Sequence, residues 1–337
     1  MFSTIYEKIK KIIKENYIYF IILSILMLAF SFPLPYYIDA PGGLINVSER
    51  LVVEDGYPIN GSLNLAYISE FKANIPTIIY ALFNKDWEIV KKEDVVASNE
   101  TIKEIEYRNH LLLEEANQNA VIVAFDKAKL DYEIKNRTVN IIYIYEEADT
   151  DLKIGDQIIE INGIKIDSKE SAVNEINKND NIKFKVINNG IEYERYANKI
   201  LIDDNKLVGI MVSETKEVIP SKEVNINFKK SESGPSGGFM MSLSIYDLLM
   251  EEDLTKGLKI VGTGTIDELG NVGVIGGVEH KIKAAVKESA DIFFVPSGNY
   301  EDAKTVVIED KLDIELIEIN HIDDAINFLN KFDKNDN

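Results

Sequence analysis

The feature that most constrains this chain is an uncharged apolar run at residues 17–35, YIYFIILSILMLAFSFPLP. A helix that crosses the hydrocarbon core of a bilayer needs about 20 predominantly apolar residues, and this run has close to that length. Tyrosines lie at its start and directly after it, as aromatic residues do at membrane interfaces. We therefore expect a transmembrane helix over residues 17–35, preceded by a basic tail over residues 1–16.

The charges on either side of this run predict its orientation. Four lysines lie between positions 8 and 14, whereas the segment after the run begins with the acidic residues Asp39 and Glu49. Positively charged flanks stay in the cytoplasm, so we expect a cytoplasmic N-terminus and a single-pass protein of the cell membrane whose remaining domains lie outside it. A cleaved signal peptide is the alternative, but its apolar core would be shorter, about 7 to 15 residues, and SFPLP is a poor cleavage site.

Composition excludes several classes of function. Asp and Glu number 57 against 37 Lys and Arg, a formal net charge of -20, and such a surface repels nucleic acid. The absence of cysteine removes disulfides, cysteine nucleophiles and zinc-thiolate sites, and three histidines argue against a histidine-rich metal site. We expect no cofactor, no metal and no nucleic-acid partner.

Residues 36–124 are expected to form a membrane-proximal region of strands and helix. Short β-like runs are interrupted by turn residues such as Pro41-Gly42-Gly43. Residues 111–130 contain no Gly or Pro and keep apolar residues at helical spacing, which predicts a helix of several turns.

The next segment, residues 125–200, has the pattern of a small β-rich module. Asn162-Gly163 supplies the positive φ angles of a tight hairpin, residues 168–178 favour a short helix, and a second strand pair is expected across Asn188-Asn189-Gly190. The sequence LKIGDQIIEING over residues 152–163 resembles that of PDZ domains attached to bacterial secreted proteases. The resemblance implies a module that binds an extended peptide as an added strand; an ordinary hairpin in some other β domain is the alternative.

A glycine-rich loop holds Ser236 between Gly234-Pro235 and Gly237-Gly238, directly before an apolar segment with helical spacing over residues 239–250. The hydroxyl is therefore expected at a helix N-terminus, where free N–H groups and the helix dipole stabilise an oxyanion. We expect the backbone N–H groups of Ser236 and Gly237 to be the oxyanion donors. Taken alone, GPSG is more typical of a turn whose serine caps the helix.

A nucleophilic serine needs a base. His110, His280 and His321 are the candidate histidines. The helical context of His110 lacks the small residues around a trypsin-like histidine, His321 lies near the chain end, and a PDZ-like module fills the middle of the chain where β-barrels would be needed. Lys281 is the better partner, because apolar residues surround it on an expected helix after Gly276-Gly277, and burial lowers the pKa of a lysine. A solvated lysine on an exposed helix face is the alternative.

With these residues in place, GPSGG followed by TGTIDELGNVGVIGGVEHK resembles the proteolytic domain of Lon-type Ser-Lys peptidases over residues 208–332. The resemblance implies that Ser236 is the nucleophile, Lys281 the general base, and Thr263 a supporting residue that orients the lysine amine. We assign residues 205–333 to this domain. Gly237 stands where cytosolic Lon has alanine, which replaces no catalytic group.

The whole layout is similar to the membrane-anchored PDZ-Lon serine proteases of Gram-positive bacteria. The expected fold class is α+β: a transmembrane helix, a β-rich membrane-proximal region, a PDZ-like domain and a Lon-type α/β domain. No GxxxxGK[ST] motif occurs in the sequence, so we expect an ATP-independent endopeptidase of extended or unfolded secreted chains. The resemblance also implies a homo-oligomeric ring. A catalytically silent, membrane-tethered PDZ scaffold that binds peptides is the alternative.

Overall fold

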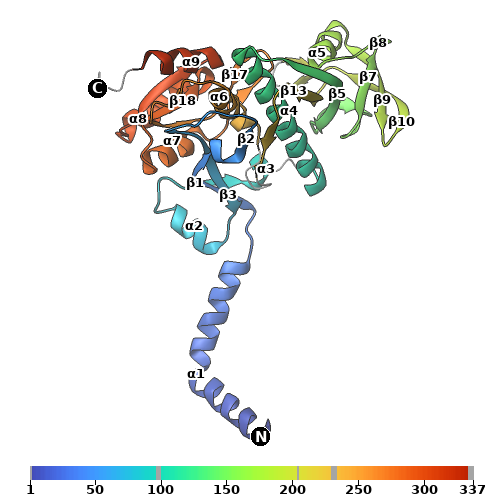
Figure 1. Ribbon diagram of the computed structural model, residues 1–337. Coiled ribbons are helices and arrows are strands. Elements are labelled where there is room, and N and C mark those ends of the chain that lie inside the picture. The colour runs from blue at the N-terminus through green and yellow to red at the C-terminus, as the bar shows by residue number, and fades with distance from the viewer. Residues whose placement is uncertain (1, 96–99, 203–204, 229–233, 333–337) are drawn as a thin grey trace. The chain divides into compact units, whose positions relative to one another are not determined.

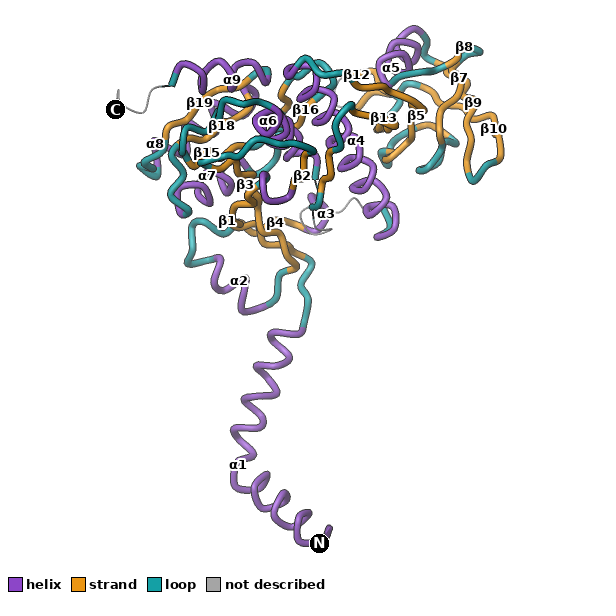
Figure 2. The backbone as a smooth tube through the Cα atoms, in the orientation of Figure 1, coloured by secondary structure: helices purple, strands orange, loops and turns teal. Residues whose placement is uncertain are grey.

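The computed structural model describes residues 2–95, 100–202, 205–228 and 234–332 and has a mixed α/β fold (Figures 1 and 2). Its contacts divide the chain into two compact units. The first comprises Met1–Gly42 and Ile68–Ala97, and the second comprises Gly43–Tyr67 and Ser98–Asn337.

The first unit begins with the long helix α1, Phe2–Ser31, which is bent at Asn16, where φ is -122° and ψ is 18°. Among the helices in the described residues, α1 is the one long and apolar enough to cross a membrane, over Ile5–Ser31, and its apolar side chains are exposed. The helix ends shortly before Pro33 and Pro35, because proline lacks the N–H that would continue a helix.

The rest of the first unit is a small sheet and helix around a modest core. The first half of β1, Tyr36–Asn46, pairs antiparallel with β4, Glu88–Lys91. Helix α2, Ile75–Ala81, begins at a capping box between Asn74 and Thr77, and α3 spans Lys92–Val95. The buried core consists of Ile38, Ala73 and Ala81.

Strand β1 continues through Pro41-Gly42-Gly43, where the sequence predicted an interruption. The ladder between β1 and β4 ends at Asp39 and Glu88, so Pro41 needs no N–H to donate on that side. A Cβ on Gly43 would lie 3.0 Å from the Tyr67 hydroxyl, so the glycine allows that ring to approach the strand. Residues that usually form turns therefore lie inside a strand here, and Gly43 allows close packing against it.

A parallel sheet forms the centre of the second unit. Strand β3, Ser62–Lys72, pairs in parallel with β15, Lys259–Gly262. Strand β15 pairs with β18, Ile292–Pro296, which pairs with β19, Glu315–Ile319. The helices that follow or connect these strands are α7 (Val278–Lys287), α8 (Ser297–Glu309) and α9 (Ile322–Lys331).

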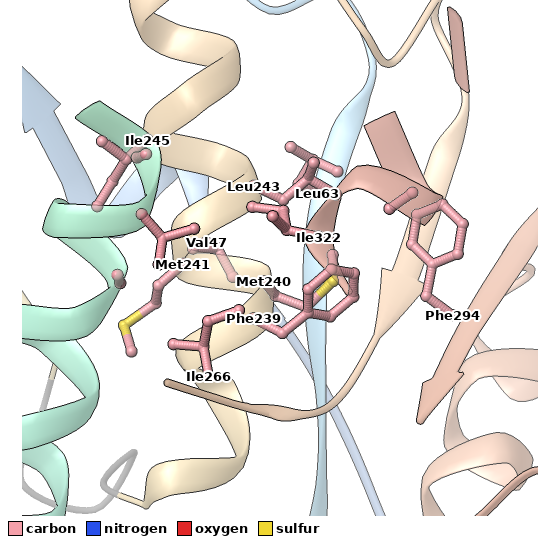
Figure 3. Close-up of a cluster of buried hydrophobic side chains, with 14 of the residues drawn as sticks. Val47, Leu63, Phe239, Met240, Met241, Leu243, Ile245, Ile266, Phe294 and Ile322 are labelled. Carbon is pink, nitrogen blue, oxygen red and sulfur yellow. The ribbon is translucent and has the colours of Figure 1, made fainter. Parts of the chain in front are cut away.

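Alternating side chains of the sheet pack into two separate cores. Val261, Phe293 and Val295 pack with α7 and α8 on one face. Ile260 and Phe294 pack on the other face, together with α9, the buried helix α6 (Gly238–Leu249) and α4 (Ile102–Ala128). Figure 3 shows the second core, in which Phe239 of α6 faces Phe294. The unit is therefore a sheet covered by helices on both faces.

Helix α4 confirms the predicted helix but begins nine residues earlier than expected, at Ile102 rather than residue 111. Thr101 and Glu104 form a capping box, with Glu104 N–H donating to the Thr101 hydroxyl over 3.3 Å. The helix ends at Ala128 and is capped by Lys129, whose φ of 56° is left-handed. Residues 102–110 are partly exposed and polar, so an apolar pattern alone did not reveal them.

A seven-stranded antiparallel sheet occupies the middle of the chain, in the order β13-β5-β7-β9-β10-β6 with β8 beside β7. Its elements are β5 (Tyr132–Ile144), β6 (Asp149–Thr150), β7 (Gln157–Ile161), β8 (Ile164–Lys165), α5 (Lys169–Lys178), β9 (Asn181–Asn188), β10 (Ile191–Asn198) and β13 (Ile210–Pro220). The hairpin turns predicted at Asn162-Gly163 and Asn189-Gly190 are confirmed, since all four residues have positive φ.

Asp156 is fully buried and accepts hydrogen bonds from Lys153 N–H (2.8 Å) and the Asn188 amide (2.7 Å).

The remaining short elements connect these parts. They are η1 (Ser48–Arg50), β2 (Leu51–Val53), β11 (Ile200–Ile202), β12 (Asn205–Leu207), β14 (Val224–Ile226), η3 (Pro235–Gly237), β16 (Thr265–Ile266) and β17 (Val272–Gly273).

The packing around Phe294 predicts a large stability effect. Phe294 is fully buried, with ring centroids 6.0 Å from Phe239 and 6.1 Å from Phe328. We expect Phe294→Ala to lower the free energy of unfolding by about 3–5 kcal/mol, because the lost ring leaves a cavity. Ile308→Ala, on an exposed position of α8, serves as the control and should change it by less than about 0.5 kcal/mol. Circular dichroism during denaturation in detergent measures both; equal effects would contradict this view of the core.

Candidate active site

Ser236 lies in the 3-10 turn Pro235–Gly237, directly before α6. The sequence predicted a helix N-terminus at this point, and the structure confirms it. The serine is partly exposed, whereas Gly237 and the first residues of α6 are buried. Residues 229–233, the first part of the glycine-rich loop, lie outside the described residues.

The Ser236 backbone is held by the residues that follow β15. Its carbonyl oxygen accepts hydrogen bonds from Gly264 N–H (2.8 Å) and from the Thr263 hydroxyl (3.3 Å). In return, Phe239 N–H donates to the Gly264 carbonyl over 3.1 Å. These bonds tie the start of α6 to the carboxyl end of a central strand.

Close packing explains the two glycines after the serine. A Cβ on Gly237 would lie 2.8 Å from Leu65 Cδ2, and a Cβ on Gly238 would lie 2.8 Å from Ile266 Cγ2. The serine turn therefore sits against β3 and β16 at a distance that only residues without a side chain permit without movement of those neighbours.

Lys281 lies in the first turn of α7 and is buried, with 4% of its surface exposed. The solvated helix-face alternative is therefore wrong for this lysine. Its Nζ donates to the Thr263 hydroxyl over 3.1 Å, and no carboxylate within the described part of the chain pairs with it. Burial lowers the pKa of Lys281 to about 8.

The structure thus connects the three residues that the sequence predicted for the site. Lys281 Nζ bonds the hydroxyl of Thr263, and that hydroxyl bonds the backbone oxygen of Ser236. An amine with a lowered pKa is neutral in an appreciable fraction of molecules near neutral pH and can then accept a proton. Chemically, the arrangement offers a hydroxyl, a proton acceptor and a helix N-terminus.

Asn299 holds the segment that leads into α7, a role the sequence did not reveal. Its side-chain oxygen accepts from Ile275 N–H over 2.9 Å, and its amide donates to the Ile275 carbonyl over 3.0 Å. Asn299 is 9% exposed. Gly277 then caps α7 with a left-handed φ of 65°, a conformation that favours glycine. The sequence does show an asparagine directly after a buried strand. It does not show which residue that asparagine contacts, because the partner, Ile275, lies 24 residues away.

A partly buried ionic cluster, also missed in the sequence, fixes the loop after β16. The Glu268 carboxylate accepts two hydrogen bonds from Arg137 of β5, at 2.6 and 2.8 Å, and pairs with Lys216 of β13. Burial raises the pKa of Glu268, but the hydrogen bonds from Arg137 and Lys216 outweigh it and lower that pKa to about 2. Asn119 of α4 donates to the Ile266 carbonyl over 3.0 Å. The seven-stranded sheet is thereby attached to the strand that follows Thr263.

Two of the histidines have contacts elsewhere. His110 lies on the exposed face of α4, 3.8 Å from Glu114, and His321 caps α9, its Nδ1 accepting from Asp323 N–H over 3.1 Å. His280 is buried in α7. Within the ranges described, no group of three His, Cys, Asp or Glu side chains could hold a metal ion.

Comparisons with known proteins match the part of the chain that holds these residues. Residues 216–330 match the Lon protease (S16) C-terminal proteolytic domain. The chain is 30% identical over 114 residues to an archaeal Lon protease of Halobacterium salinarum, 28% over 137 residues to a Lon protease of Campylobacter jejuni, and 32% over 126 residues to an archaeal Lon protease of Methanocaldococcus jannaschii.

These matches cover 33%, 39% and 34% of this chain, and they span 16%, 17% and 18% of the three relatives, less than a fifth of each. They therefore concern one domain and not whole proteins. Over residues 216–330 the chain contains a Lon protease C-terminal proteolytic domain, which supports serine peptidase activity.

Proposed function

We propose that this chain is a serine endopeptidase with a Ser-Lys dyad, in which Ser236 is the nucleophile and Lys281 the general base. The observation that carries the proposal is the buried amine of Lys281, bonded to the Thr263 hydroxyl beside the Ser236 turn. A buried lysine without a carboxylate partner costs stability, and activation of a nucleophile is a reason to keep one. Thr263 acts as a positioning residue.

The proposed reaction has two steps. Neutral Lys281 accepts the Ser236 hydroxyl proton as Oγ attacks the carbonyl carbon of a peptide bond, and the resulting ammonium gives that proton to the leaving amine. A water molecule then loses a proton to Lys281 and attacks the acyl-serine ester. The carboxylic acid product leaves and Ser236 recovers its proton, so the enzyme returns to its starting state.

We propose that the N–H groups of Ser236 and Gly237 bind the oxyanion. Both residues lie in the turn that opens α6, where backbone N–H groups lack helical partners and the helix dipole is positive. Outside the 3-10 turn itself, neither N–H donates to another backbone group among the described residues.

We further propose that cleavage needs no ATP, because no GxxxxGK[ST] motif occurs in the 337 residues. Substrates would then be extended or unfolded chains, without an unfolding step. The seven-stranded sheet with α5 is proposed as a PDZ-like module. A cavity of about 440 Å³, lined by residues that include Val173 of α5, Glu214 of β13 and Leu269, is a candidate contact for such a chain.

The proposed location is the cell membrane, with α1 as a single-pass anchor, the basic tail in the cytoplasm and the catalytic domain outside. The supporting observation is the exposed apolar surface of α1 over Ile5–Ser31. A homo-oligomeric ring remains a proposal by resemblance to Lon-type domains.

Substitution of the dyad tests the proposed chemistry. We expect Ser236→Ala and Lys281→Met each to lower cleavage of an unfolded protein, without nucleotide, by at least about three orders of magnitude. Lys281→Met should not unfold the protein. The charged ammonium destabilises the buried site by about 3 kcal/mol at pH 7, so this variant should be at least as stable as the wild type.

Product analysis on a gel, with thermal unfolding as the control, measures both effects. A Lys281→Met variant that still cleaves would mean that another group is the base. A wild type that binds peptide without turnover would favour the peptide-binding scaffold.

The lowered pKa of Lys281 predicts a specific pH dependence. Because the base must be neutral, kcat/KM should rise about tenfold per pH unit well below the pKa and level off above a midpoint near pH 8. The free energy of unfolding should also rise with pH, between about pH 8 and 10.5, because the unfolded chain binds more protons than the folded chain in that window. Initial rates on a peptide between pH 6 and 10 measure the profile, and a flat profile over this range would contradict Lys281 as the base.

Thr263→Val tests the positioning role. Valine keeps the shape but removes both the acceptor for Lys281 Nζ and the donor to the Ser236 carbonyl. We expect kcat to fall by up to about a hundredfold with little change in KM, because the base loses its orientation and substrate contacts remain. Thr263→Ser keeps the hydroxyl and should retain most activity. Equal kcat values for the two variants would show that the hydroxyl has no such role.

A further inference from the structure

The first unit exposes a group of large apolar side chains on and directly after α2. They are Ile75 (43% exposed), Ile79 (53%), Tyr80 (53%), Leu82 (69%) and Phe83 (88%), here called the apolar lip. Soluble surfaces rarely concentrate apolar side chains in this way, and such patches mark interaction sites. The lip is independent of the Ser236 site and of the residues matched to the Lon domain.

The buried core of the first unit does not include the residues of the lip. Ala81 of α2 is buried with Ile38 and Ala73, and Ile78 packs against them. The side chains of the lip are 43–88% exposed, and Tyr80 contacts Trp87, which packs against this core. Packing within the first unit therefore does not account for the exposed apolar surface of Ile79, Leu82 and Phe83.

The lip is fixed to the end of the helix that can cross a membrane. The Asn74 amide donates to the Phe30 carbonyl of α1 over 3.1 Å, and Leu34 N–H donates to the Ala73 carbonyl over 2.9 Å. Helix α2 begins one residue later, and its seven residues span only about 10 Å. Figure 1 shows α2 beside the end of α1. The lip therefore lies within about one helix length of the point where the apolar run stops.

The chemistry of the lip and its neighbours suits the boundary between lipid headgroups and acyl chains. Tyrosine and tryptophan concentrate at this depth. Tyr80 of the lip makes an edge contact with Trp87, with ring centroids 4.6 Å apart, and Trp87 in turn contacts Phe71 at 5.4 Å. The exposed Lys85 follows the lip and can stay at the headgroups while Phe83 reaches deeper.

We propose that the apolar lip inserts into the bilayer surface beside α1, as a second membrane contact of the first unit. The proposal rests on the proposed membrane location of α1 and deepens it: the bilayer is the partner of the lip, and Leu82 and Phe83 provide the insertion. This contact holds the first unit close to the lipid surface, since a single helix alone would leave the unit free to tilt.

The chain contains no cysteine, so single-cysteine labelling of the full chain tests the proposal. Phe83→Cys carries a polarity-sensitive fluorophore, and the chain is reconstituted in phosphatidylcholine vesicles with or without nitroxide-labelled acyl chains. Ile308→Cys, 65% exposed on α8, is the matched control. We expect a blue-shifted emission and about a twofold loss of fluorescence with nitroxide lipid at position 83, and neither at position 308.

Flotation of the same vesicles distinguishes the two proposals, insertion of the lip and membrane anchoring by α1. If the chain floats with the vesicles but position 83 is quenched no more than position 308, the lip proposal is wrong and the membrane location stands. If the chain does not float, both are overturned. Cleavage by a Leu82→Ser, Phe83→Ser variant in detergent should equal that of the wild type, because the lip contributes nothing to the Ser236 site.

Discussion

The burial of the Lys281 amine is the constraint on which the rest of the site depends. A lysine ammonium removed from water loses hydration that one hydroxyl cannot replace, so burial lowers its pKa to about 8. A chain selected only for stability would place an aliphatic side chain here, since apolar replacement of buried charge is often neutral or stabilising. The surrounding fold must therefore supply enough packing to hold a group that opposes folding.

The fold meets this requirement by assembling the site at the carboxyl end of a parallel strand. Thr263 directly follows β15, Lys281 comes from α7 on one face of the sheet, and Ser236 precedes α6 on the other face. Ligand sites of open α/β sheets lie at this edge for the same geometric reason, because loops from both faces meet there. Asn299 and the Glu268 cluster then fix two segments of the chain between Thr263 and α7. Polar contacts thus hold the segments around the buried Lys281 side chain.

Local signals in the sequence predicted the parts of the fold that neighbouring residues determine. Asn162-Gly163 requires positive φ and so predicts its hairpin, Gly276-Gly277 precedes the start of α7, and the glycines around Ser236 predict the tight turn before α6. Pairings between distant segments could not be predicted this way. The parallel pairing of β3 with β15 joins residues almost 200 positions apart, and it places residues 43–67 in the same unit as the C-terminal domain.

The same distinction applies to the site. The residue types of Ser236 and Lys281 predicted which groups could react, and resemblance added Thr263 as a supporting residue, but the burial of Lys281 depends on long-range packing. The Asn299 and Glu268 contacts join segments 24 and 131 residues apart, which no local pattern reveals. The PDZ-like assignment, the domain boundaries and the catalytic roles stay predictions.

The most direct measurement is the identity of the residue that becomes acylated. An activated peptide ester is mixed with the full chain in detergent, the reaction is quenched in acid within a turnover, and the acyl group is located by peptide mass spectrometry. A covalent intermediate through Ser236 predicts one adduct on that serine in the wild type and none in Lys281→Met. Cleavage of the ester with no adduct on Ser236, or with the acyl group on another residue, would contradict the proposed mechanism.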